Sequence, residues 1–160
     1  LIMEAGKEFD LALIGMRAMD SLRIEKSYRM WGQDLTTEYS PFEASMERFV
    51  RLDKPDFVGR EALLRQQEDG VPHRFVTLAC EVDDADPLGN EPLYLGNAMV
   101  GRATAGAYGH HVDKALALGY VSPEAAQVGT TLAIEILNKR YPATVIEESP
   151  YDPENKSLRA

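Results

Sequence analysis

Hydrophobic positions along the chain follow two different spacings, and the change comes at Pro72. Before Pro72 the apolar residues recur every three or four positions, which is the spacing of one face of an α-helix. After Pro72 they alternate with polar residues in short segments separated by glycine, asparagine and proline, a pattern typical of β-strands. The sequence therefore predicts an α+β chain, with helices first and a small antiparallel β-barrel or sandwich second.

The first half contains several segments with helical spacing. Residues 1–9 fit the end of a helix that stops at Gly6, and residues 15–26 fit an amphipathic helix. Residues 41–54 fit a short helical turn that runs into a strand, since both spacings match part of the segment. Residues 59–68 predict a further short helix, which ends before a glycine and a proline.

The second half predicts a series of short strands and then an irregular arm. Glycine, proline and asparagine mark a turn between each strand and the next. The prolines of the arm, which begins at Ser149, interrupt any regular spacing. The expected strands cover residues 74–82, 91–95, 98–108, 115–121, 131–137 and 140–146.

Charged side chains are concentrated between Gly15 and Pro41, the stretch that also holds the only tryptophan, Trp31. Opposite charges one helical turn apart stabilise a helix by only a few tenths of a kcal/mol. The charged residues here therefore form either a solvated helix face or a buried ionic network, and the pattern alone leaves both open. They are Arg17, Asp20, Arg23, Glu25, Lys26 and Arg29.

Composition narrows the functional class. A formal charge of −9 argues against a protein that binds nucleic acid through its phosphates, because such binding rests on clustered cations. No apolar run reaches the length of a membrane span, and no signal segment is visible. The single cysteine, Cys80, lies in an alternating apolar run and is interpreted as a buried structural thiol. We expect a soluble protein of a bacterial cytoplasm or a mitochondrial matrix, and the helix-like start at Leu1 predicts a fragment of a longer chain.

Three polar or glycine-rich clusters were weighed as ligand sites. Adjacent histidines at 110 and 111 point to opposite sides of an extended segment, so they are interpreted as a loop pair. The acidic residues within 83–86 lack the spacing of a calcium loop and predict a solvated hairpin tip. The glycines within 101–109 lie in strand-like sequence, where they indicate bulges or close backbone approach.

Several segments follow one another in a distinctive order along the chain: AMDSLRIE from Ala18, WG at Trp31, SPFEA from Ser40, FVGREAL from Phe57, VG at Val100, TAG at Thr104 and KALALGYV from Lys114. In this order they resemble the aminomethyltransferase family, which is typified by the glycine-cleavage T-protein. The stretch EKSYR and the ending SPYDPENK look most like the folate-binding part of sarcosine and dimethylglycine dehydrogenases or oxidases.

This resemblance implies a division of the chain and a place in a larger enzyme. Residues 1–71 would be the C-terminal portion of the folate-binding domain, 72–149 the C-terminal β-barrel domain and 150–160 an irregular tail. An upstream FAD-containing part would oxidise an N-methyl amine such as sarcosine or dimethylglycine. The C-terminal part would capture the one-carbon unit on tetrahydrofolate, giving 5,10-methylenetetrahydrofolate.

The same resemblance implies that this chain supplies only part of a site. The family's acid/base aspartate, and the tyrosine and glutamate that hold the pterin, belong to earlier segments, as does any flavin-binding motif. We therefore expect no catalytic residue within this chain and no activity from it alone. It would provide one wall of the folate cavity and the barrel that closes it.

Two departures from the T-protein pattern fall at expected folate contacts. Met19 stands where T-proteins commonly carry an arginine that contacts the folate, and Arg48 stands where they can carry an aromatic residue. A guanidinium group suits both aromatic faces and carboxylates, so Arg48 fits the p-aminobenzoyl-glutamate portion of folate. The alternative is a surface ion pair between Arg48 and Glu43 or Glu47.

Two aromatic residues complete the set of expected folate-binding side chains. Trp31 either faces the ligand or packs between helix and barrel, and Tyr108 lies at a strand end flanked by glycines. The substitutions at Met19 and Arg48 also motivate a second hypothesis, in which the chain is a non-catalytic folate-binding or interaction module related to the T-protein.

Overall fold

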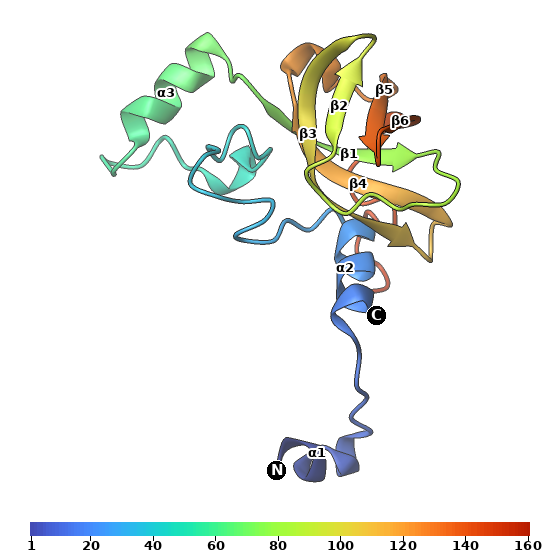
Figure 1. Ribbon diagram of the computed structural model, residues 1–160. Helices are drawn as coiled ribbons and strands as arrows, with labels where there is room; N and C mark the ends of the chain where they lie inside the picture. Colours follow the sequence, from blue (N-terminus) through green and yellow to red (C-terminus); the bar gives the residue numbers. More distant parts are fainter.

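Six antiparallel strands close into a barrel in the computed structural model, which describes residues 1–160 (Figure 1). The order around the barrel is β1-β4-β3-β2-β5-β6, so it has no free edge. The α+β class and all six expected strands are confirmed. Their bounds are β1 Arg74–Cys80, β2 Pro92–Leu95, β3 Ala98–Gly109, β4 Lys114–Val121, β5 Thr131–Ile136 and β6 Lys139–Ile146.

Close backbone packing accounts for the glycine at position 101. In the β3–β4 pairing Gly101 lies opposite Val121, and a Cβ at this glycine would lie 2.0 Å from the carbonyl oxygen of Tyr120. No side chain fits in that space. The register of the same strand pair shifts between Ala103 and Ala105, so both expected features, a bulge and close approach, are present.

The barrel buries its apolar residues in two clusters. Fifteen residues fill the interior, including Leu78 and Leu93, which have no exposed surface. Seven more, including Ile24 of the helix α2 (Met16–Glu25), pack on the outer face of the barrel. Cys80 belongs to the interior cluster, and burial raises the pKa of its thiol to about 12, in keeping with a structural thiol.

Helical elements lie mainly before the barrel. The expected helices at 15–26 and 59–68 are confirmed. Gly6 is the C-cap of the N-terminal helix Ile2–Ala5, where the sequence placed a helix end. The strand expected within 41–54 is absent, because the closed barrel leaves no edge for it to pair with. The bounds are α1 Ile2–Ala5, α2 Met16–Glu25 and α3 Arg60–Asp69, with 3₁₀ turns at Lys7–Phe9, Glu47–Phe49 and Pro123–Ala125.

The expectation of a hairpin tip at residues 83–86 is wrong. β1 pairs with β4 and β6, and β2 pairs with β3 and β5, so the segment between β1 and β2 is a crossover. Two of its acids are tied to the start of β6, since Lys139 Nζ donates to Asp83 at 2.9 Å and Tyr141 Oη to Asp84 at 3.0 Å. Short-range turn signals do not distinguish a hairpin from a crossover.

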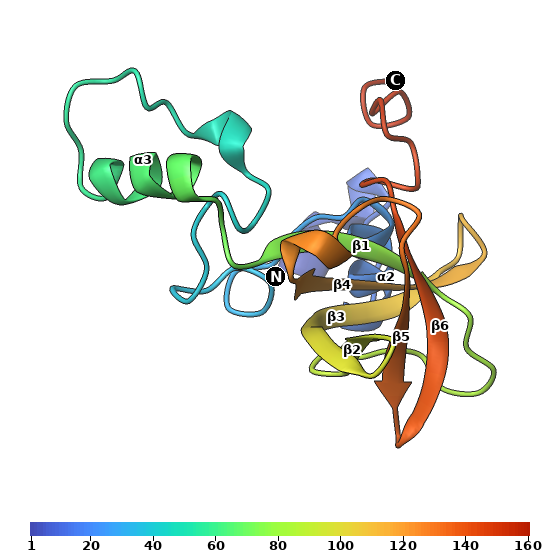
Figure 2. The same ribbon diagram turned by 90° about the horizontal axis from the view of Figure 1, so that it is seen from above.

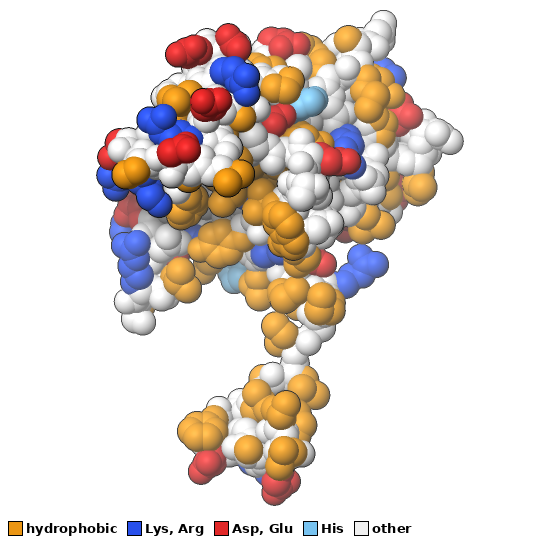
Figure 3. All heavy atoms as spheres, turned by 90° about the vertical axis from the view of Figure 1, so that its left-hand side faces the viewer, with side chains coloured by type: hydrophobic (Ala, Val, Ile, Leu, Met, Phe, Trp, Pro, Cys, Tyr) orange, Lys and Arg blue, Asp and Glu red, His pale blue; other side chains and the backbone are white.

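Residues before β1 extend away from the barrel in two directions. Residues 1–15 form an extended N-terminal arm, called the arm below, which leads away from α2 and carries α1 near its end (Figure 1). α3 with the neighbouring 3₁₀ turn forms a lobe to one side (Figures 1 and 2). Hydrophobic side chains cover much of the arm (Figure 3). None of the helices is both long and apolar enough to cross a membrane.

Candidate functional site

A buried ionic network joins α2 to the loop that follows it. Arg23 donates from Nη1 to Asp34 Oδ2 at 2.7 Å and from Nε to Asp20 Oδ1 at 2.9 Å. The Asp34 side chain has no exposed surface and that of Arg23 only 9%. The first alternative for this charged stretch, a solvated face, is therefore wrong for Arg23, because water cannot reach most of its guanidinium group.

Asp34 also anchors the loop to the barrel. Its carboxylate accepts hydrogen bonds from the backbone N–H of Met30 and from the hydroxyl of Thr104 on β3, and its carbonyl oxygen accepts from Tyr120 Oη at 2.8 Å. Both oxygens of this buried carboxylate therefore have a hydrogen-bond donor. Asp34 was not among the residues expected from the sequence, since its partners on the barrel, Thr104 and Tyr120, lie far along the chain.

Glu25 forms a second buried contact at the C-terminal end of α2. The carboxylate has 1% exposed surface and accepts from the backbone N–H of His111 at 2.6 Å and of Val112 at 3.2 Å. His111 Nδ1 lies 2.8 Å from the other carboxylate oxygen, and the His111 ring stacks on Tyr151 of the tail. The histidine pair therefore sits in the β3–β4 turn, as expected, but one member fixes α2 to the barrel.

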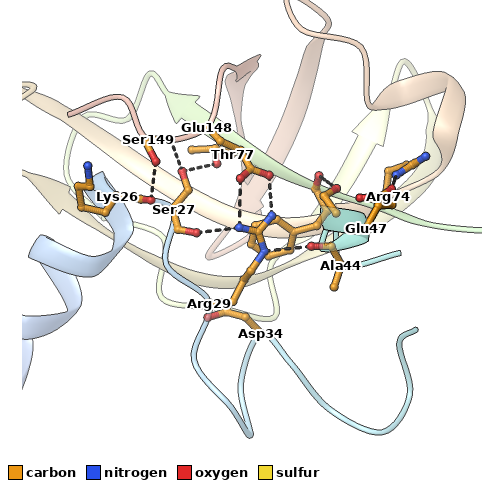
Figure 4. Close-up of polar contacts among 12 residues, drawn as sticks. Lys26, Ser27, Arg29, Asp34, Ala44, Glu47, Arg74, Thr77, Glu148 and Ser149 are labelled. Carbon is orange, nitrogen blue, oxygen red and sulfur yellow. Dashed lines mark hydrogen bonds and ion pairs between the residues drawn. The ribbon is translucent and has the colours of Figure 1, made fainter. Parts of the chain in front are cut away.

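Arg29 lies in the loop that follows α2 and contacts both the barrel and the C-terminal segment (Figure 4). Its guanidinium lies 4.1 Å from the centre of the Phe75 ring and binds both carboxylate oxygens of Glu148, at 2.5 and 3.1 Å. Nε donates to the carbonyl oxygen of Ala44 at 3.0 Å. Bidentate pairs of this kind fix direction as well as distance.

Three successive carbonyl oxygens ahead of Arg48 accept hydrogen bonds from this side of the barrel. The carbonyl of Ala44 accepts from Arg29, that of Glu43 from the backbone N–H of Phe75 at 2.8 Å, and that of Phe42 from Arg74 Nη1 at 3.2 Å. Two of these carbonyls are thus held by β1 and the third by the loop after α2. The 3₁₀ turn Glu47–Phe49, which carries Arg48, begins three residues after Ala44.

Arg48 makes no hydrogen bond or ion pair, and its guanidinium carbon lies 4.7 Å from the centre of the Phe49 ring. Both acids that were considered as its partners are occupied elsewhere. Glu47 pairs with Arg74, and Glu43 accepts from the backbone N–H of Ser40 and lies 3.1 Å from His73 Nδ1. The surface ion pair weighed for Arg48 is therefore absent.

The other three expected folate-binding residues lie in different surroundings. Met19 is on α2 and 36% exposed, and Trp31 is 73% exposed on its loop, so it does not pack between helix and barrel. Tyr108 lines a cavity of about 760 Å³ between α2 and β3, together with Asp20, Ser21 and other residues. Met19, Trp31 and Arg48 do not line this cavity. The chain therefore does not gather the four residues around one hollow.

Tyr108 is held by contacts at both ends. Its carbonyl oxygen accepts from Ser21 Oγ of α2 at 2.6 Å, and its phenol donates to the carboxylate of Asp113. That hydrogen bond raises the pKa of the Tyr108 phenol above its usual value, because the carboxylate favours the protonated phenol.

Two domain models of one protein family match this chain. Residues 73–152 match the model of the glycine cleavage T-protein C-terminal barrel domain, and residues 1–54 match that of the GCVT N-terminal domain. The chain belongs to the glycine-cleavage T-protein family. Its fold agrees with a solved structure of glycine cleavage system aminomethyltransferase T from Bartonella henselae, at a TM-score of 0.86, 23% identity, and coverage of 94% of this chain and 43% of that chain.

Two enzymes illustrate the relatives. Dimethylglycine dehydrogenase, mitochondrial, from Mus musculus is 40% identical over 148 residues, which cover 92% of this chain and 17% of the relative. The 4-methylaminobutanoate oxidase (formaldehyde-forming) from Paenarthrobacter nicotinovorans is 35% identical over 159 residues, or 99% of this chain and 19% of the relative. The chain thus spans less than a fifth of the length of these relatives.

Proposed function

We propose that this chain is the C-terminal part of a flavin-dependent N-methyl amine dehydrogenase and forms one wall of the tetrahydrofolate site in its aminomethyltransferase module. Tetrahydrofolate would accept the one-carbon unit released by amine oxidation. The observation that carries the proposal is the match along nearly the whole chain to dimethylglycine dehydrogenase, in a region that also matches aminomethyltransferase domain models.

Arg48 supports the folate part of this proposal. Its guanidinium group has no acidic partner, and the carbonyl oxygens of the turn before it accept three hydrogen bonds, two from β1 and one from Arg29. A free, well-placed guanidinium group suits a carboxylate ligand. In this proposal Arg48 binds the glutamyl portion of folate, while Met19, Trp31 and Tyr108 contact other parts of the ligand.

Exposed apolar side chains support a role within a longer protein. The arm and the outer face of α2 carry large hydrophobic residues with high exposure, and α1 buries none of its residues. A contiguous apolar surface of this kind marks an interaction site. It includes Leu1, Ile2, Phe9, Leu13, Ile14 and Met16.

The proposed domain division separates the residues before the barrel from the barrel itself. We place a folate-binding portion at 1–71, the barrel domain at 72–149 and a tail at 150–160. The first portion contacts the outer face of the barrel, and the barrel has its own interior core. FAD would be held by residues outside this chain.

Product analysis of the complete gene product tests the function. With sarcosine or dimethylglycine as substrate, added tetrahydrofolate should give 5,10-methylenetetrahydrofolate in place of free formaldehyde. Formaldehyde release at an unchanged rate and yield would contradict the proposal. Omission of the amine provides the control for folate breakdown.

A second candidate function is a folate-related module that transfers nothing. The relative from Paenarthrobacter nicotinovorans is named as formaldehyde-forming, and this chain matches it along 99% of its length. Folate binding by the complete gene product, with formaldehyde as the only one-carbon product, would favour this candidate.

A further inference from the structure

We propose that Arg74 is a positioning residue that keeps Arg48 available for an anionic ligand by holding the neighbouring acid, Glu47. The inference rests on the proposed function, in which that anion is the glutamyl carboxylate of folate. It goes further because it assigns a role to a residue outside the expected site.

Glu47 is the acid beside Arg48 in the chain, and both belong to the 3₁₀ turn Glu47–Phe49. An acidic side chain next to a ligand-binding arginine competes with an anionic ligand for the same guanidinium group. In the structure this competition is absent. Arg74 Nη1 donates to Glu47 Oε1, and the two side chains lie together above the start of β1 (Figure 4).

The pair is poorly suited to stabilising the fold. The side chains of Arg74 and Glu47 are 41% and 44% exposed, and pairs as exposed as this contribute little to the free energy of folding. The same guanidinium nitrogen also donates to the carbonyl oxygen of Phe42 at 3.2 Å, which fixes where the Glu47 carboxylate is held. The contact is therefore better explained by its effect on the neighbouring arginine.

Arg29 fixes the other side of the turn. Its side chain is only 11% exposed, and it holds the carbonyl of Ala44 while it binds Glu148 and stacks on Phe75. With Ala44 held by one arginine and Glu47 by another, the backbone leading to Arg48 has little freedom. Loss of Arg74 would release the Glu47 carboxylate but leave the Ala44 anchor in place.

Because loss of Arg74 frees the Glu47 carboxylate without removing the Ala44 anchor, the role of Arg74 can be tested by a second substitution that restores ligand binding. Binding of 5-formyltetrahydrofolate and of its counterpart without glutamate, 5-formyltetrahydropteroate, is measured by calorimetry with the complete gene product. Arg74→Ala should weaken binding of the first ligand about fivefold and leave the second unchanged, as expected for loss of a partly exposed ionic contact. In the double variant Arg74→Ala with Glu47→Gln, binding should return to within about twofold of wild type.

A matched control is Arg140→Ala, which removes another half-exposed arginine paired with a glutamate, Glu135, on the barrel. It should leave binding of both ligands unchanged. Equal weakening of both ligands by Arg74→Ala, or no recovery in the double variant, would show a merely structural role and overturn the inference. If the wild-type protein binds neither ligand, the proposed function is overturned as well. If the wild-type protein binds both ligands but the double variant does not recover binding, only the role of Arg74 is overturned and the proposed function stands.

Discussion

The barrel and the residues before it are held together in opposite ways. The barrel has a closed interior of fifteen apolar residues, whereas α1, α3 and the first two 3₁₀ turns bury none of their residues. α2 buries Ser21, Arg23, Ile24 and Glu25, three of which are polar or charged. The comparison teaches that the barrel has an apolar interior of its own, while the preceding region is held by specific polar contacts and by a small apolar cluster on the outer face of the barrel, and leaves much of its other apolar surface exposed.

The largest effect should come from breaking the buried ion pair. Asp34→Ala removes the fully buried one of the two carboxylates that Arg23 contacts, and with it the acceptor for Met30 N–H and the Thr104 hydroxyl. We expect a loss of about 3–5 kcal/mol in the free energy of unfolding, measured by urea denaturation. Asp53→Ala, which removes the exposed partner of Arg51, is the control and should cost less than about 1 kcal/mol. Equal effects of the two variants would contradict the account.

Truncation of leucine compares the apolar contacts of the two regions. Leu78→Ala in the barrel interior, at 0% exposure, should cost about 3 kcal/mol because it leaves a cavity. Leu13→Ala on the arm, at 80% exposure, should change the free energy of unfolding of this chain by no more than about 0.5 kcal/mol. A large effect at Leu13 would mean that the arm packs on the rest of the chain.

A smaller effect is expected where the tail meets α2. Lys26 Nζ donates to the carbonyl oxygens of Tyr151 and Asp152, at 3.2 and 2.6 Å, and to Asn155 Oδ1 at 2.7 Å. Lys26→Ala should cost about 1 kcal/mol and speed tryptic cleavage within the tail. Lys139→Ala, whose partner Asp83 lies far from the tail in sequence, should leave cleavage there unchanged.

The smallest effect concerns the titration of Tyr108. Its phenol donates to Asp113, so its pKa is raised from the usual value of about 10. The contribution of this hydrogen bond to stability is therefore fully present below the usual tyrosine pKa and is lost as pH rises through the higher folded-state value. Asp113→Asn should bring the pKa of Tyr108 down, measured from the ultraviolet absorbance of tyrosinate in comparison with Tyr108→Phe. An unchanged titration would show that Asp113 does not set it.

Local pattern was sufficient for most of the fold. The strands and the helices at 15–26 and 59–68 follow from spacing and from glycine and proline stops, because each element is specified by its own residues. The strand order was beyond such reasoning. The crossover between β1 and β2 depends on partners distant in the chain, so the turn residues at 83–86 were misread as a hairpin.

The candidate site was less accessible to sequence reasoning. Arg48, Met19, Trp31 and Tyr108 came from comparison with a family pattern, and their role stays a prediction. The roles of Arg29 and Asp34 depend on contacts with residues far along the chain, Glu148 and Thr104, which no periodicity reveals.

The most direct test of the central claim is a crystal structure of the complete gene product with 5-formyltetrahydrofolate bound. The account predicts that the Arg48 guanidinium group lies within hydrogen-bond distance, about 3 Å, of a glutamyl carboxylate, with Arg74 still holding Glu47. A bound ligand whose carboxylates lie elsewhere, with Arg48 paired to Glu47, would contradict it.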